Sequence, residues 1–184
     1  GKQFAEVNVR RIDKKYRAEY SFKKAYCAFE NALLEEALAG FKEVDSLPVS
    51  DYTAPSRYAV GYIYYDRKDF KEALVWFDKS VKDSRFVDMS SYYIMECRFM
   101  LSDYAYVTEN GDRMYEKVPK GRKPSLARMI SEAWLVLGDA EQARKYMDLN
   151  SQEGGRPKGR ADWFYRGSVL YAVKDYRGAI DSFN

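Results

Sequence analysis

The side chains that most often carry proton transfer and metal binding are scarce in this sequence. It has no histidine in 184 residues, which removes the commonest general base and the commonest metal ligand. A Ser-His-Asp or Cys-His site cannot form within the chain. Cys27 and Cys97 lie 70 residues apart with no C-x-x-C pairing, which is unlike a zinc site. Each follows an apolar helical pattern, so we predict two small buried hydrophobic side chains.

Carboxylates and glycines give no clearer catalytic signal. Acidic pairs such as Glu35/Glu36 and Asp66/Asp69 fall at predicted turns and helix starts. No Walker-type loop is present, and no dinucleotide-binding glycine pattern follows a strand. We interpret the glycine-rich stretch 153–160 as a solvated connector and not as a phosphate cradle. The sequence therefore predicts no enzyme, no metal, no cofactor and no small-molecule substrate.

The charge balance does not favour nucleic acid or a membrane. The chain has 31 basic and 28 acidic residues, for a net charge of +3. No apolar run approaches the roughly 18 residues of a transmembrane helix. Helical repeat proteins can read RNA one base per repeat, but that needs polar side chains where this sequence has mostly aromatic ones. RNA binding therefore remains a minor alternative, which would depend on two basic clusters: Arg10, Arg11, Lys14, Lys15 and Arg17, and Lys120, Arg122 and Lys123, with Arg156, Lys158 and Arg160 as further candidates.

A short pattern recurs along the chain and organises the rest of the sequence. A turn-type residue is followed by Asp, usually an aromatic residue, two variable residues and a small apolar one. The copies span 68–73, 102–107, 138–143 and 174–179, with a degenerate copy at 33–37. Their last residues are spaced by 36, 34, 36 and 36 positions, and they are Ala37, Ala73, Val107, Ala143 and Ala179. A period of this length indicates a helical repeat.

A second set of mostly small residues precedes these positions by 12 residues each time. Its members are Ala25, Gly61, Met95, Ser131 and Gly167. Two antiparallel helices joined by a short turn can cross closely where both carry small side chains. The two sets therefore predict five helix-turn-helix hairpins, each crossing at one residue from each set.

Helix starts and stops divide the chain in the same way. The recurring Asp69, Asp103, Asp139 and Asp175 are suited to cap the second helix of each pair. The five prolines fall between pairs, where a helix must end or begin. We predict repeats at about 17–52, 53–87, 88–123, 124–159 and 160–184, preceded by an N-terminal arm or partial helix at 1–16. Since the chain stops inside the last predicted helix, we expect it to be part of a longer repeat protein.

These residues resemble the tetratricopeptide repeat (TPR), in which W-x2-L-G-x2-Y is followed by A-x3-F. The second repeat matches with Val60-Gly61-x2-Tyr64 and Ala73-x3-Phe77, and the fifth with Trp163-x3-Gly167 and Ala179-x3-Phe183. The third repeat matches least, and we expect a distorted or longer second helix there, running through Val118. The resemblance implies an all-α fold, a right-handed superhelix of about five helix-turn-helix repeats, that is, an α-solenoid.

The resemblance also implies a concave face, formed by the first helices, that receives a peptide or protein. Aromatic residues make up 16% of the chain and include 17 tyrosines. Counting from the small residue of each first helix places many of them on that face. The predicted peptide-binding residues are Phe22, Tyr26, Phe29, Tyr58, Tyr62, Tyr65, Tyr92, Phe99, Phe164 and Tyr171. The alternative is that these rings pack on neighbouring repeats or on the arm at 2–16, since aromatic stripes are often core.

The sequence therefore predicts a non-enzymatic scaffold that binds a protein or peptide partner. A structural part of a bacterial envelope or outer-membrane assembly is the alternative, because the Tyr-rich repeats look similar to those of envelope TPR proteins. On the same analogy we expect the periplasm or cell envelope in preference to the cytoplasm. The identity of the partner does not follow from the sequence.

Overall fold

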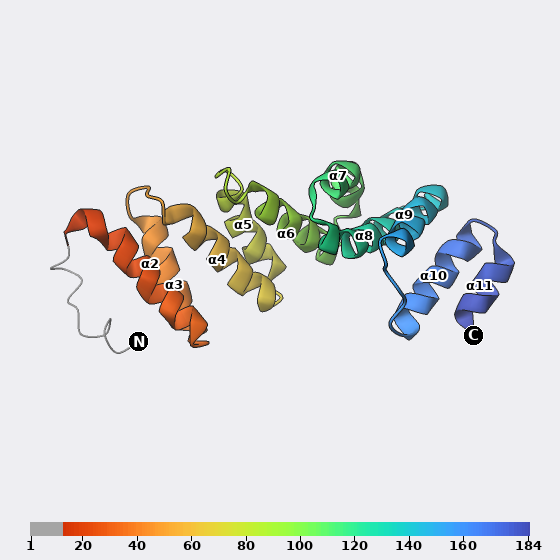
Figure 1. The fold of residues 1–184 in the computed structure, drawn as a ribbon, viewed down its shortest axis with the longest axis horizontal. Helices are drawn as coiled ribbons and strands as arrows, with labels where there is room; N and C mark the ends of the chain where they lie inside the picture. Colours follow the sequence, from red (N-terminus) through yellow and green to blue (C-terminus); the bar gives the residue numbers. More distant parts are fainter. Residues whose placement is uncertain (1–12) are drawn as a thin grey trace. The chain divides into compact units, whose positions relative to one another are not determined.

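The computed structural model describes residues 13–184; the predictions for 1–12, which concern most of the N-terminal arm and the basic residues Arg10 and Arg11, lie outside that range. Within it the chain is helical and contains no β-strand. The helices group into two compact units that divide after Cys97, inside α6. In order they are α2 (Lys14–Glu30), α3 (Leu34–Ser46), α4 (Thr53–Asp66), α5 (Phe70–Ser80), α6 (Val87–Met100), α7 (Tyr104–Lys117), the 3-10 helix η2 (Lys120–Arg122), α8 (Lys123–Val136), α9 (Ala140–Gln152), α10 (Arg160–Ala172) and α11 (Tyr176–Phe183), as Figure 1 shows.

The turn inside each hairpin has one recurring backbone conformation. The residue two positions before the second helix has a left-handed φ, at 57° for Ala32, 62° for Lys68 and Ser102, 64° for Lys174 and 87° for Gly138. A left-handed residue reverses the chain tightly, and its cost is lowest for glycine. Four of the five turns therefore place a residue with a side chain where glycine would be less strained.

The predicted aspartate caps are confirmed at all four positions. The Asp69 carboxylate accepts a hydrogen bond from the backbone N–H of Glu72 at 3.3 Å, and Asp139 accepts one from Gln142 at 3.0 Å. Asp103 and Asp175 accept in the same way from Tyr106 and Gly178. Each bond satisfies an N–H group that the first turn of a helix leaves without an intrahelical partner. The first hairpin differs, because Leu33 stands at the cap position of α3 and offers no side-chain bond.

The small residues predicted to mark the helix crossings lie in the core. All ten positions of the two sets are buried. In the first unit, a Cβ on Gly61 would come within 2.9 Å of the Phe77 ring, and one on Gly40 within 2.7 Å of Ala25. In the second unit, the Ser131 hydroxyl donates to the backbone carbonyl of Ala143, which joins the two predicted crossing residues of α8 and α9 directly. The prediction of an all-α fold of stacked hairpins is therefore confirmed.

Local departures from the prediction are small. Among the described residues the first helix, α2, begins at Lys14, three residues before the predicted start of the repeats. The second helix of the third repeat, α7, has 14 residues, against 13 in α3 and α9 and 11 in α5, and it ends one residue before Val118. Gly111 of α7 lies against the side chain of Ile130 in α8, where a Cβ would come within 3.1 Å. The close contact of α7 is therefore with the following helix.

Candidate functional site

Aromatic rings of the first unit gather around Tyr93 in α6. The Tyr93 ring lies 4.9 Å from Tyr65, 5.8 Å from Tyr62 and 6.1 Å from Tyr58, all measured between ring centroids and all close to edge-on. On its other side it stacks on the buried Phe77 at 5.2 Å. Edge-to-face and offset arrangements at these separations are the favourable geometries for aromatic pairs. Each ring is therefore held by its neighbours.

The first two hairpins extend this group. Tyr58, Tyr62 and Tyr65 are four and then three residues apart in α4, so they lie along one stripe of the helix. Tyr62 also meets the edge of Phe29 in α2 at 6.4 Å. We call the set Tyr26, Phe29, Tyr58, Tyr62, Tyr65 and Tyr93 the aromatic face. The α2 and α4 rings of this set therefore meet through Phe29 and Tyr62, and Tyr26 lies three residues before Phe29 on α2.

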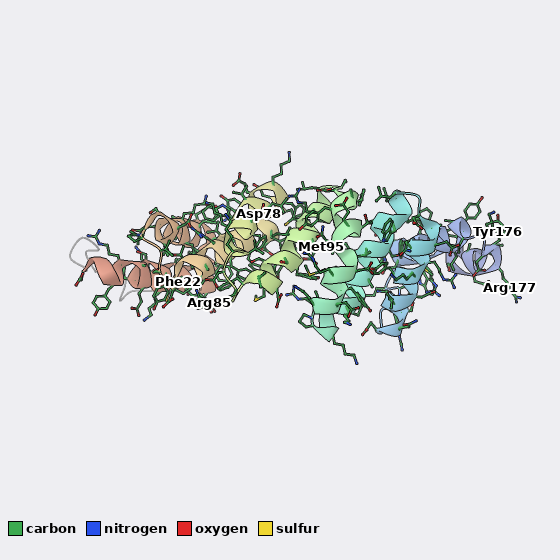
Figure 2. All side chains as sticks on the ribbon, turned by 90° about the horizontal axis from the view of Figure 1, so that it is seen from above. Phe22, Asp78, Arg85, Met95, Tyr176 and Arg177 are labelled. Carbon is green, nitrogen blue, oxygen red and sulfur yellow. The ribbon has the colours of Figure 1, made fainter. Side chains whose placement is uncertain are left out.

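The residues of the aromatic face are only partly covered. The Tyr26 side chain is 50% exposed, and the other five are half-buried. Phe22, labelled in Figure 2, contributes less of its surface, because its ring contacts Phe41, Tyr52 and Tyr26 at 5.7, 5.3 and 6.2 Å. The rings therefore serve two roles at once: one side packs between helices, and the other remains accessible.

Tyr92 does not present its ring as expected. Only 7% of it is exposed, and its hydroxyl donates to the Glu96 carboxylate at 2.7 Å. The accessible ring of this pair is Tyr93, which the sequence reasoning missed. Successive residues of an α-helix point about 100° apart. An error of one residue in placing α6 therefore exchanges the buried ring for the accessible one.

Two carboxylates lie beside the aromatic face: Glu30, which accepts a hydrogen bond from the Tyr26 hydroxyl, and Glu96, which accepts one from that of Tyr65. Glu96 is half-buried, and it accepts from Tyr92 as described. Burial, followed by the hydrogen bond and the charge of Glu96, raises the pKa of Tyr65. Tyr65 therefore keeps its proton and acts as a hydrogen-bond donor at any physiological pH.

The predicted site residues of the second unit do not join into one ring cluster of this kind. Phe99 is half-buried and meets Tyr104 edge-on at 5.7 Å. Phe164 is 67% exposed and lies 5.7 Å from Phe183, while Tyr171 is 63% exposed and lies 5.6 Å from Tyr176. Each of these three rings pairs with a residue of the second helix of its own hairpin.

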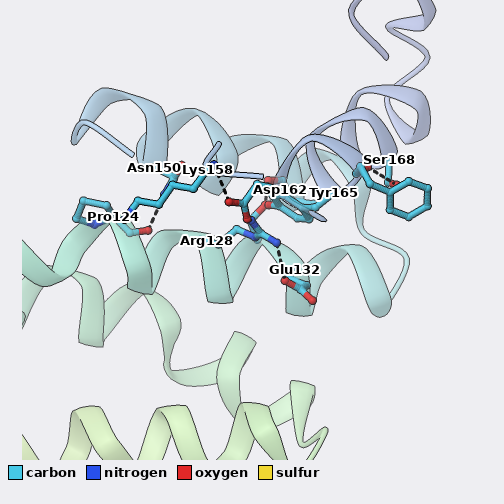
Figure 3. A network of polar contacts seen from close by, with 11 residues as sticks. Pro124, Arg128, Glu132, Asn150, Lys158, Asp162, Tyr165 and Ser168 are labelled. Atoms are coloured by element: carbon cyan, nitrogen blue, oxygen red, sulfur yellow. Dashed lines mark hydrogen bonds and ion pairs between the residues drawn. The ribbon is translucent and has the colours of Figure 1, made fainter. Parts of the chain in front are cut away.

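Instead, the second unit carries a polar network around Arg128 of α8 (Figure 3). The Arg128 guanidinium donates to Asp162 of α10 and, at 3.3 Å, to Glu132 one turn along α8. Its carbon atom lies 3.8 Å from the centroid of the Tyr165 ring. The backbone N–H of Lys158 also donates to Asp162 at 2.9 Å, and this bond, followed by that from Arg128, lowers the pKa of the Asp162 carboxyl. Asp162 is therefore ionised and fixed in place.

The stretch 153–160 forms one wall of this network. Its residues connect α9 to α10 and are mostly exposed, as the interpretation as a connector requires. They are also anchored at both ends, because the Asn150 amide donates to the carbonyl of Pro124 at 2.7 Å and packs under Gly155. The contact between Lys158 and Asp162 fixes the other end. This anchoring depends on contacts with α8 and α10, which no local sequence signal indicates.

The two cysteines differ in their burial. Cys97 is fully buried, and burial raises the pKa of its thiol to about 12. Cys27 is half-buried, so the prediction that it is buried was too strong. Among residues 13–184, no three His, Cys, Asp or Glu side chains gather in a way that could hold a metal ion. Over the same range, no helix has the length and apolarity that crossing a membrane requires.

Comparison with known proteins supports the fold and no more. No family profile and no curated protein matches the chain. A solved structure titled "MamA MSR-1 C2", of a TPR-containing protein, superposes with a TM-score of 0.69 over 91% of this chain and 93% of that one, at 13% sequence identity. At so low an identity the likeness is one of architecture. The chain therefore has a TPR-like helical repeat fold.

Proposed function

We propose that this chain is a member of the TPR family that works as a non-enzymatic scaffold, and that its aromatic face binds a peptide or a protein surface carrying apolar side chains. The observation that carries the proposal is a group of half-buried rings locked around Tyr93, together with the half-exposed Tyr26, which lies three residues before Phe29 of the aromatic face on α2. A packed core alone does not require Tyr26 to face solvent. The TPR-like fold supports the same class of function by analogy.

The mutual packing of the rings favours binding. Tyrosine offers a large contact area and has few rotatable bonds, so little entropy is lost when it is fixed by a ligand. Here the Tyr62 and Tyr65 rings are already fixed, at 5.8 and 4.9 Å from Tyr93. A partner would therefore meet a preorganised surface, which lowers the cost of association.

The chemistry of the face also limits the partner. Its rings suit apolar or aromatic side chains. The Tyr65 hydroxyl donates its one proton to Glu96, so towards a partner it can only accept a hydrogen bond, for example from a main-chain N–H. Glu96 places a negative charge at the edge of the face, so an acidic side chain would be repelled there. We therefore expect a neutral or basic segment, extended or helical, that docks with apolar anchors.

Affinity capture with matched tyrosine variants tests the proposal. The test variant is Tyr26→Ala, Tyr62→Ala. The control is Tyr64→Ala, Tyr176→Ala, which removes one half-buried and one exposed tyrosine elsewhere: Tyr64 meets Lys42 of α3, and Tyr176 is 53% exposed in α11. Loss of two contact tyrosines should weaken the specific interaction by about tenfold or more, since such anchors are worth about 1–2 kcal/mol or more each. The proposal fails if test and control recover the same proteins in the same amounts.

The role in a bacterial envelope assembly stays a prediction of the sequence resemblance. A scaffold would use the same aromatic face in the cell envelope and in the cytoplasm. The affinity-capture experiment therefore tests the face whichever of the two compartments holds the protein.

A further inference from the structure

A hollow in the second unit carries more basic than acidic side chains among its lining residues. It has a volume of about 510 Å³ and lies between the start of α8, the end of α9, the connector 153–159 and the start of α10. Its charged lining residues are four cations and one carboxylate: Arg128, Arg156, Lys158, Arg166 and Asp162. A small concave site with this excess of positive charge attracts anions.

A second hollow continues the positive region. It is lined by Lys120 and Lys123 together with Gln152 and Glu153, and it shares Gly154 with the first. Two of the basic clusters in the sequence, around 120–123 and 156–160, are thus brought together in space. The first hollow holds Arg156 and Lys158, and the second holds Lys120 and Lys123.

The walls of the first hollow are fixed by contacts already described. Asn150 ties the connector to Pro124, and a Cβ on Gly155 would come within 2.5 Å of the Asn150 amide atoms. Arg128 is held between the Tyr165 ring and two carboxylates, as Figure 3 shows. A site with fixed walls loses less entropy when a ligand binds.

Asp162 shows how this hollow can hold a carboxylate group. Its two carboxylate oxygens accept from the Arg128 guanidinium and from the backbone N–H of Lys158. Three other cations line the same hollow: Arg156 and Lys158 are exposed, and Arg166 reaches only a 3.4 Å contact with the Ser151 hydroxyl. Their donors remain available to carboxylates from outside the chain.

We infer that this hollow binds an acidic peptide segment, rich in Asp or Glu, of a protein partner. A nucleic acid fits it less well. A nucleic-acid backbone needs a continuous track of cations along its phosphates, whereas Asp162 and Glu153 interrupt the positive charge here. A short peptide can place single carboxylates beside the cations while avoiding Asp162 and Glu153. The site lies in the second unit, so it is independent of the aromatic face.

Peptide titration with charge-matched variants tests this inference. The probe is a fluorescent peptide of about ten residues in which Asp alternates with Ser, and the reference probe carries Asn in place of Asp. Wild-type protein should bind the acidic probe, with an affinity that falls steeply as salt is raised, because exposed charges are screened. The variant Arg156→Gln, Lys158→Gln should lose about tenfold or more in affinity. The control Lys71→Gln, Lys82→Gln changes the net charge equally in exposed residues of the first unit and should bind as the wild type does.

The possible results separate this inference from the proposed function. The Tyr26→Ala, Tyr62→Ala variant should bind the acidic probe normally, whatever its effect on capture. The inference is overturned if wild-type protein does not bind the probe, if both double-Gln variants bind it equally, or if a single-stranded oligonucleotide of the same charge binds more tightly than the peptide.

Discussion

Gly61 of α4 lies directly against the ring of Phe77 in α5, so closely that a Cβ would come within 2.9 Å of two ring carbons. The same relationship recurs in the last hairpin, where a Cβ on Gly167 would come within 2.4 Å of the Phe183 ring. In both cases the ring belongs to the residue four positions after the small residue of the second helix. Because glycine has no Cβ, the aromatic ring of the second helix can lie directly against the backbone of the first helix, and the two helices approach closely.

The two glycines should respond differently to alanine. Phe77 is fully buried and cannot move, whereas Phe183 is 49% exposed and can swing away. Gly61→Ala should therefore cost about 1–3 kcal/mol through overpacking. Gly167→Ala should be neutral or stabilising by up to about 1 kcal/mol, because alanine favours the helix. Urea denaturation of both variants measures the difference, and equal midpoints would show that the ring at Gly61 is not held as described.

The missing cap of the first hairpin can be supplied. Leu33 has φ −84° and ψ 67°, nearly the values of the capping Asp69 at −86° and 73°. Leu33→Asp should therefore accept a hydrogen bond from the N–H of Glu36 and stabilise α3 by about 1 kcal/mol. The reciprocal change, Asp139→Ala, should lose a similar amount. Thermal unfolding of the two variants checks the pair; a Leu33→Asp protein no more stable than wild type would contradict the shared turn geometry.

The two thiols should differ in reactivity. Cys97 is fully buried and the pKa of its thiol is raised to about 12, so at pH near 8 the thiol is neutral and inaccessible. Cys27 is half-buried in α2. A colorimetric thiol reagent should therefore modify Cys27 in the folded protein, and Cys97 only after denaturation. In a Cys27→Ser variant the native reaction should disappear; persistent fast labelling of that variant would show that α6 is not packed as described.

Stability should decrease at alkaline pH through buried tyrosines. Burial raises the pKa of Tyr165 from 10.0 to about 12. Above pH 10 the unfolded chain releases this proton while the folded chain retains it, so the contribution is complete below pH 10 and is lost as the pH rises towards 12. Comparing urea midpoints at about pH 9 and about pH 11 measures this loss. The decrease should be smaller in Tyr165→Phe, which has no proton to release; identical decreases would place Tyr165 in contact with solvent.

Much of the fold could be predicted because its determinants are local. The Asp caps at 69, 103, 139 and 175 act on an N–H group three residues away, so their spacing alone identifies the helix starts. The small residues at the crossings form a pattern within each hairpin. Neither signal depends on how separate hairpins pack.

The two proposed binding surfaces were harder to predict because they depend on contacts between hairpins. Tyr93 and Tyr92 are adjacent in sequence, and only the rotation of α6 against α4 and α5 decides which ring is buried. The basic hollow depends on Asn150 reaching Pro124, a contact across 26 residues of sequence. No residue in 153–160 indicates that contact, so the sequence alone predicted only a solvated connector there.

Site-specific photo-crosslinking tests the central claim, that the partner docks on the aromatic face, most directly. A benzophenone-bearing phenylalanine analogue would replace Tyr26 in one protein and Val75 of α5, which is 49% exposed, in the other. We predict that position 26 captures a specific protein from native extract and that position 75 does not. Equal capture from both positions, or capture from position 75 alone, would contradict the claim.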